Sequence, residues 1–146
     1  MAYGDSGFSV PKGAPANSPK SPCTEGEVVG KDSTGKEVVR SKKFLIDSGA
    51  TRSAIDRENL KGMSVEYKGA LVSQTASGTV AIDIFSGATF KFQATNAAGQ
   101  KVDLLCKEPF VLLNLALLGG DQLKATGATV TLDYKAETVS IKGEKQ

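Results

Sequence analysis

The chain has 146 residues, with 18 Lys and Arg side chains against 16 Asp and Glu, and it contains no histidine. Without an imidazole, neither a Ser/His/Asp nor a Cys/His nucleophile system can be assembled, and two cysteines cannot fill a tetrahedral zinc site. A net charge of +2 is too small and too evenly spread for a nucleic-acid-binding surface. Any catalytic proton transfer must therefore use carboxylates, lysines or tyrosines.

The length and the composition, 40% hydrophobic and 23% charged, are typical of one soluble globular domain. The longest apolar run, 110–118, is interrupted by Asn114 and is far shorter than the roughly 20 residues of a membrane-spanning helix. No secretory signal is recognisable at the start of the chain. Cys23 and Cys106 form no motif, and we interpret them as reduced thiols of a cytoplasmic protein.

Residues 1–25 differ in composition from the rest of the chain. They hold four of the five prolines, interleaved with Gly, Ser and Lys, and few large apolar side chains. Such a segment cannot bury enough apolar surface to offset the entropy lost on ordering. We therefore expect a disordered leader over 1–25 and one folded domain over 26–146.

From residue 27 onward, alternating β-branched and aromatic residues predict short strands. These strands are expected over 27–29, 37–39, 42–46, 65–72, 80–85, 89–94 and 102–106, with a last hairpin over 129–132 and 138–141. A short helix is predicted over 120–125 and should end at Gly127. Many short strands with one small helix indicate an all-β barrel or sandwich.

A carboxylate directly follows the apolar strand predicted over 42–46. Asp47 opens a turn made of small residues, namely Ser48, Gly49, Ala50 and Thr51. Glycine permits close backbone approach in such a turn, and the serine hydroxyl can form local hydrogen bonds. Taken alone, Asp47 could simply cap the turn, as Asp often does.

A second segment gives this turn a functional interpretation. Leu-Ile-Asp-Ser-Gly-Ala at 45–50 and Leu-Leu-Gly-Gly-Asp-Gln-Leu at 117–123 together resemble the two signatures of the retropepsins, the single-domain aspartic proteases of retroviruses, retrotransposons and some cellular proteins. Between them, 72–80 resembles the flap hairpin of that family, with Gly78 at its tip and an Ala-x-Gly pattern similar to copia-type members. The resemblance covers 27–141.

The resemblance implies a small closed barrel of the retropepsin type with one short helix, active as a C2 homodimer. Asp47 from each of two chains would form a catalytic dyad, in which two close carboxylates share a proton and activate a water for peptide hydrolysis. It implies no metal and no organic cofactor. An extended peptide, such as a segment of a polyprotein, would lie between the Asp47 turn and the flap residues Thr75, Ala76, Ser77 and Gly78.

Two positions depart from the retroviral pattern. Retroviral members often carry an Asp after the first signature and an Arg after the second Gly, and the two side chains pair near the dimer interface. Here these positions hold Thr51 and Gly120, so both charges are missing together and neither is left unpaired. The resemblance further implies dimer contacts at 27–29 and 138–141, and groove walls that include Ile55 and part of 110–115. For most residues of 110–118, however, we prefer the interpretation as a plain core strand.

Two alternatives to an active protease stay open. A retropepsin-like barrel without activity could serve as a dimerisation or peptide-binding module, since a groove that binds an extended peptide does not have to cut it. An unrelated small β-barrel could also carry an accidental Asp-Ser-Gly triplet. The triplet recurs at 5–7, where no apolar strand precedes it and where we expect no function. Self-cleavage, the oligomeric state and the activity of an Asp47→Asn variant discriminate these cases.

Overall fold

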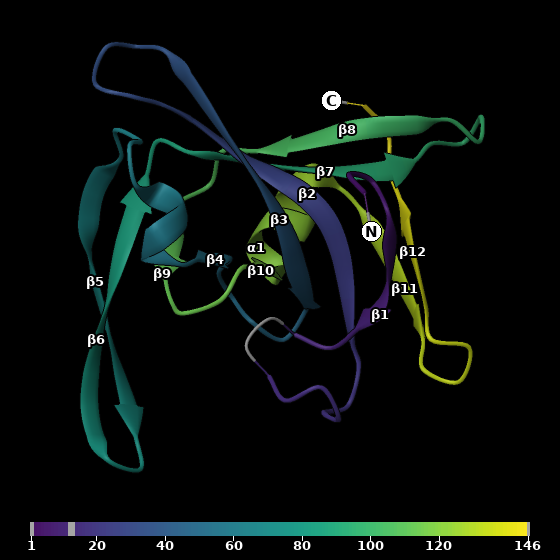
Figure 1. Cartoon of the computed structure of the whole chain (residues 1–146), viewed down its shortest axis with the longest axis horizontal. Helices are drawn as coiled ribbons and strands as arrows, with labels where there is room; N and C mark the ends of the chain where they lie inside the picture. The colour runs from purple at the N-terminus through teal and green to yellow at the C-terminus, as the bar shows by residue number, and fades with distance from the viewer. Residues whose placement is uncertain (1, 12–13, 146) are drawn as a thin grey trace.

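Strands make up most of the chain in the computed structural model, which describes residues 2–11 and 14–145 (Figure 1). The strands are β1 (Ser6–Ser9), β2 (Ser21–Lys31), β3 (Glu37–Asp47), β4 (Ala54–Ile55), β5 (Glu66–Thr75), β6 (Gly78–Ser86), β7 (Thr89–Thr95), β8 (Lys101–Cys106), β9 (Phe110–Leu112), β10 (Leu117–Gly119), β11 (Thr129–Asp133) and β12 (Thr138–Lys142). The helices are a 3-10 turn, η1 (Arg57–Leu60), and α1 (Gly120–Thr126). The all-β class is therefore confirmed. No helix in the described ranges is long and apolar enough to cross a membrane.

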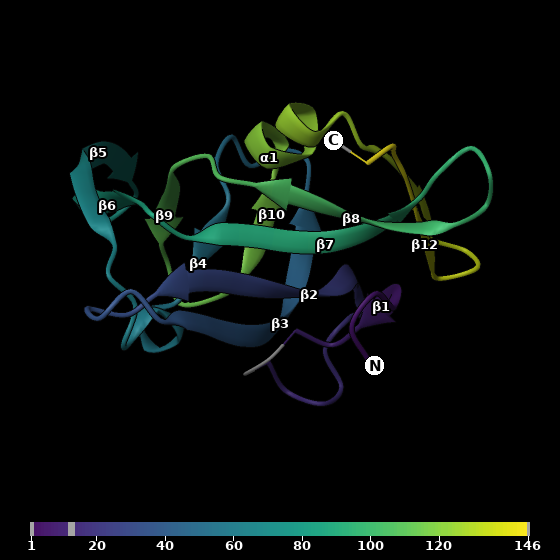
Figure 2. The ribbon, with the colours of Figure 1, turned by 90° about the horizontal axis from the view of Figure 1, so that it is seen from above.

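The strands form one mixed sheet whose path is open. Its order is β11-β12-β7-β2-β3-β10-β4-β9-β6-β5, with β1 beside β2 and β8 beside β7. Within the described residues, the terminal strands β11 and β5 do not pair, and their hairpins lie at opposite ends of the molecule in both views (Figures 1 and 2). The closed barrel expected from the sequence is thus not formed by these pairings, because no described strand joins β5 to β11. The β5–β6 hairpin joins the rest of the sheet through two residue pairs between β6 and β9.

The N-terminal segment differs from the disordered leader expected over 1–25. β1 pairs antiparallel with the beginning of β2, and Cys23 and Thr24 are buried. Burial of apolar side chains is not the only source of order here, because backbone pairing with a core strand also orders a polar segment. The folded domain therefore begins before residue 26. Residues 1, 12 and 13 of the expected leader, and residue 146, lie outside the described residues.

Polar contacts of Tyr3 hold the start of the described chain on the sheet. The Tyr3 hydroxyl donates a 2.6 Å hydrogen bond to Asp103 Oδ1 on β8. Lys91 Nζ on β7 lies 3.8 Å from Asp103 Oδ2, 3.4 Å from Glu27 Oε1 and 5.2 Å from the centroid of the Tyr3 ring. Burial, helped by the bond to Asp103, raises the pKa of Tyr3, and the same bond lowers the pKa of Asp103.

Tyr3→Phe should lower the free energy of unfolding by about 1 kcal/mol at neutral pH, because it removes the donor to Asp103. The folded-state pKa of Asp103 lies below its ordinary value of 3.8, so this stabilisation is present above that pH and is lost as the pH falls through the lower value. Urea unfolding of both proteins at neutral and strongly acidic pH should show the difference shrinking with acid. Tyr67→Phe is the control, since Tyr67 is 57% exposed; an equal loss in both variants would contradict the prediction.

β3 carries Asp47 out of the core. Sequence patterns predict strands over 37–39 and 42–46, which the structure joins into one strand. Phe44 and Ile46 are buried on one face of β3, and the Phe44 ring lies 5.4 Å from that of Phe90, which in turn lies 5.4 Å from Phe110. Aromatic packing of this kind fixes the position of the strand end and thus of the residue that follows.

α1 lies beyond the carboxyl end of β10 and closes the second signature. Gly127 ends the helix with φ of +70°, and its N–H bonds to the carbonyls of Leu123 and Lys124. A left-handed residue favours glycine at this position. The predicted short helix and its glycine stop are confirmed.

Candidate active site

Asp47 is the last residue of β3, and its own turn orients its carboxylate. Asp47 Oδ1 accepts a 3.1 Å hydrogen bond from the Gly49 N–H, and the Asp47 carbonyl accepts one of 3.1 Å from the Ala50 N–H. Asp47 is half-buried, whereas Ser48 and Gly49 are exposed. The carboxylate therefore sits at the end of a buried strand with its orientation fixed, on a turn that a second molecule can reach.

β10 brings the two signatures together. It lies between β3 and β4, parallel to β3, with Gly119 directly opposite Asp47. The Leu45 N–H donates a 3.0 Å hydrogen bond to the carbonyl of Ala116, one residue before β10. Segments that are about 70 residues apart in the sequence thus form adjacent strands, and both end at the same place.

The turns after β3 and β10 are joined by main-chain hydrogen bonds. The Gly120 N–H donates to the Ala50 carbonyl at 2.7 Å, and the Asp121 N–H donates to the Thr51 carbonyl at 3.1 Å. Thr51 and Gly120 are the two positions that depart from the retroviral pattern. Here, backbone groups at and beside those positions link the turns without a charged pair.

A buried serine adds a side-chain link that the sequence pattern missed. Ser53 is fully buried, accepts a 2.8 Å hydrogen bond from the Gly119 N–H and donates one of 3.2 Å to Asp121 Oδ1. Asp121 Oδ1 also accepts a 2.8 Å bond from the Gln122 N–H. Burial raises the pKa of Asp121, against the opposing effect of these hydrogen bonds. In the sequence, Ser53 could have been noticed only as a hydroxyl residue directly before the apolar pair Ala54–Ile55.

One protomer offers one oriented carboxylate. Asp121 is engaged with Ser53 and the start of α1, so it does not supply a second free carboxylate beside Asp47. Within 2–11 and 14–145, no group of three or more His, Cys, Asp or Glu side chains is arranged to hold a metal ion. Within these ranges, a single chain thus presents one oriented carboxylate at this turn.

The predicted flap is a long hairpin formed by β5 and β6. It turns at Ala76 and Ser77, and Gly78 has φ of +125°, a conformation that favours glycine. All three residues are exposed; the side chain of Thr75 lies outside the described part of the structure. Figures 1 and 2 place the hairpin to one side of the carboxyl end of β3, so its tip and the Asp47 turn are not brought together within one protomer.

The base of the hairpin, in contrast, is continuous with the Asp47 turn. Ile82 and Ile84 of β6 pack against the same small apolar cluster as Leu45 and Ala50. That cluster consists of Ala54, Val111 and Leu117. The base of the hairpin and the Asp47 turn are therefore packed on one shared buried cluster.

The expected groove wall requires a correction at Ile55, which is fully buried and cannot line a groove. Phe110 and Val111 are 0% and 6% exposed, as expected for the core strand that we predicted for most of 110–118. An apolar run in the sequence does not show whether its side chains line a groove or are buried, because burial depends on which other strands cover them. Leu113 and Leu115, at 39% and 37% exposure in the loop after β9, are the accessible apolar side chains of this region.

The expected dimer contacts also require a correction. Residues 27–29 pair with β3 on one side and with β7 on the other, so this part of β2 has no free edge for an intermolecular sheet. Residues 138–141 pair with β11. Among the described strands, β11 itself pairs only with β12. An intermolecular strand could therefore add to β11, but not to 27–29.

Comparison of the chain with protein-family models and with curated proteins found no match.

Proposed function

We propose that this chain is an aspartic endopeptidase of the retropepsin type and that it acts as a C2 homodimer. The observation that carries the proposal is the parallel pairing of β3 with β10, which sets Gly119 opposite Asp47 and unites the two signatures. The carboxylate is oriented by the Gly49 N–H on an exposed turn. Two copies related by a two-fold axis would bring two such carboxylates face to face.

The reaction divides acid and base roles between the two copies of Asp47. Two close carboxylates do not ionise together, so the pair holds one proton. The ionised copy takes a proton from a water molecule while the oxygen of that water attacks the scissile carbonyl carbon. The protonated copy donates to the carbonyl oxygen, and a proton then passes to the leaving amine as the C–N bond breaks. A chain without histidine can perform this chemistry.

The substrate is an extended peptide, such as a segment of a polyprotein. Leu71, Val72 and Val80 of the hairpin are 40%, 71% and 45% exposed, and Leu113 and Leu115 are exposed on the loop before β10. Closure of the hairpin over a bound peptide would bury these side chains and add main-chain hydrogen bonds. The free, buried thiols of Cys23 and Cys106 suit a reducing cytoplasm, the location that we propose.

A peptide-binding module without activity is the second candidate. The observation that favours it is the position of the hairpin beside the carboxyl end of β3 rather than across it (Figure 1). A hairpin fixed there would leave a bound peptide open to solvent on one side. Such a module would bind peptides and form dimers but release no cleavage products.

Incubation of the purified chain with an unfolded protein over a pH series should release peptides, fastest at mildly acidic pH. A pepstatin-like inhibitor should block this release, because it places a hydroxyl between the two carboxylates where the attacking water would lie. Sedimentation at the same protein concentration should show a dimer. Cleavage by a monomer, or cleavage that the inhibitor leaves unchanged, would contradict the mechanism; dimers that bind but do not cleave would establish the second candidate.

A further inference from the structure

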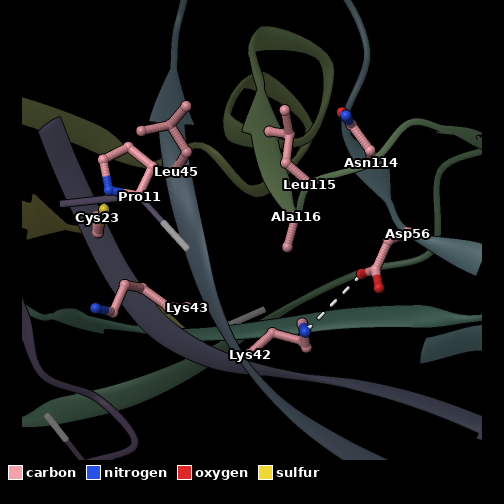
Figure 3. A pocket seen from close by; sticks show the side chains of 9 residues that line it. All are labelled: Pro11, Cys23, Lys42, Lys43, Leu45, Asp56, Asn114, Leu115 and Ala116. Atoms are coloured by element: carbon pink, nitrogen blue, oxygen red, sulfur yellow. Dashed lines mark ion pairs between the residues drawn. The ribbon is translucent and has the colours of Figure 1, made fainter. Parts of the chain in front are cut away.

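A cavity of ≈ 410 Å³ lies beside β3 at the point where β10 joins it (Figure 3). Its apolar lining includes Leu45 of β3 and Leu115 and Ala116 from the loop that leads into β10. Its polar lining includes Lys42 and Lys43. The volume is within the range of cavities that hold a small ligand or a long side chain.

Along both strands, the lining of the cavity ends a few residues before the Asp47 turn. Leu45 lies two residues before Asp47 on β3, so the two side chains share a face and their Cα atoms are about 6.6 Å apart. Ala116 lies three residues before Gly119, which is directly opposite Asp47. A peptide held at the Asp47 turn would therefore place a neighbouring side chain at the mouth of this cavity.

The two lysines differ in how their charges are compensated. Lys42 Nζ lies 3.8 Å from Asp56 Oδ1, with side-chain exposures of 11% and 26%, and Figure 3 shows the two pointing toward each other. Within the described residues, Lys43 forms no ion pair, although Glu25 is its partner in the β2–β3 register. Lys43 is exposed and lines the cavity. Lys43 thus contributes a cation without an ion pair to the lining of this partly apolar cavity, four residues before Asp47 on β3.

We propose that this cavity is a specificity subsite for an acidic side chain of the peptide substrate, Glu above all, and that Lys43 is the residue that selects it. The methylenes of Glu would pack against Leu45 and Leu115, and its carboxylate would pair with the Lys43 ammonium. Gln has the same length without the charge, and Lys would bring two ammonium groups together. This inference rests on the proposed protease function and adds the class of substrate side chain.

Digestion of a proteome-derived peptide library, with the products sequenced by mass spectrometry, tests the subsite directly. The wild-type chain should enrich Glu or Asp by about 2- to 5-fold at one position within about three residues of the cut, as expected for a partly exposed ion pair. Lys43→Gln should remove the enrichment, and Lys43→Glu should shift it to Lys and Arg. Lys135→Gln is the matched control, because Lys135 is exposed in the β11–β12 turn, away from the cavity lining.

Peptide binding to the Asp47→Asn variant separates failure of the subsite from failure of the protease. The probes are two fluorescent decapeptides, one alternating Val with Glu and the other Val with Gln. The Glu peptide should bind about threefold more tightly, and adding Lys43→Gln, but not Lys135→Gln, should remove the difference. Cleavage without acidic enrichment would overturn the subsite and leave the protease standing. Absence of cleavage would overturn the proposed protease function. In that case, equal binding of the Glu and Gln peptides would also overturn the subsite, whereas tighter binding of the Glu peptide would support it.

Discussion

Asp47→Asn should reduce peptide-bond hydrolysis by about three orders of magnitude or more, because both the acid and the base of the proposed mechanism are copies of this one carboxylate. At mildly acidic pH, the Asn amide can neither take the proton of the attacking water nor donate one to the scissile carbonyl. The fold should survive, since the Asn carbonyl oxygen can still accept the hydrogen bond from the Gly49 N–H. Cleavage of an unfolded protein and sedimentation of the variant measure the two effects separately.

A mixing experiment shows whether two chains share one site. Adding an equal amount of the Asp47→Asn variant to a fixed amount of wild-type chain should lower activity to about half, because random pairing converts wild-type dimers into inactive mixed dimers. Asp5→Asn is the matched control: it alters the same Asp-Ser-Gly triplet outside the site, where the Asp5 carboxylate accepts a local bond from the Ala2 N–H. Undiminished cleavage by Asp47→Asn would overturn the assignment, and unchanged activity on mixing would rule out a shared site.

The local features of the site were predictable because each depends on neighbouring residues. The apolar strand that delivers Asp47, its turn of small residues and the Gly127 stop of α1 all follow from short patterns of side-chain size and backbone freedom. Alternation likewise predicted most strands, which form at or near their expected positions. These elements place a carboxylate on a turn, and they do so without any long-range information.

The long-range features were not predictable from such patterns. β10 has three residues, and only its pairing with β3 and β4 distinguishes it from the end of an apolar run. Ile55 was expected on a groove wall, but neighbouring strands cover it completely. The position of the β5–β6 hairpin depends on two residue pairs with β9, and the segment before residue 26 is ordered by partners distant in sequence. In each case, the contact that decides the structure joins residues that are far apart in the sequence, so a short sequence pattern does not reveal it.

Gly119→Ala should destabilise the protein by at least about 2 kcal/mol, the largest expected effect on folding, because the added methyl group has nowhere to go. A Cβ atom at Gly119 would lie 2.5 Å from both the carbonyl carbon and oxygen of Arg52 and 2.9 Å from the Ser53 nitrogen. These are backbone atoms on the turn after β3, so they cannot rotate away as a side-chain end would. Gly119 is extended, with φ of −92° and ψ of 174°, so the effect is steric and not conformational.

Relief of this overlap requires β10 to move away from the Arg52–Ser53 backbone, which would break the hydrogen bond from the Gly119 N–H to Ser53 Oγ and shift Gly119 away from Asp47. Hydrolysis should therefore fall together with stability. Gly7→Ala is the matched control, because Gly7 is also in a strand and an added Cβ there would meet nothing within 4 Å. Urea unfolding of both variants measures the difference. If Gly119→Ala were as stable as Gly7→Ala, β10 could not lie against the turn after β3, and the pairing that unites the two signatures would be wrong.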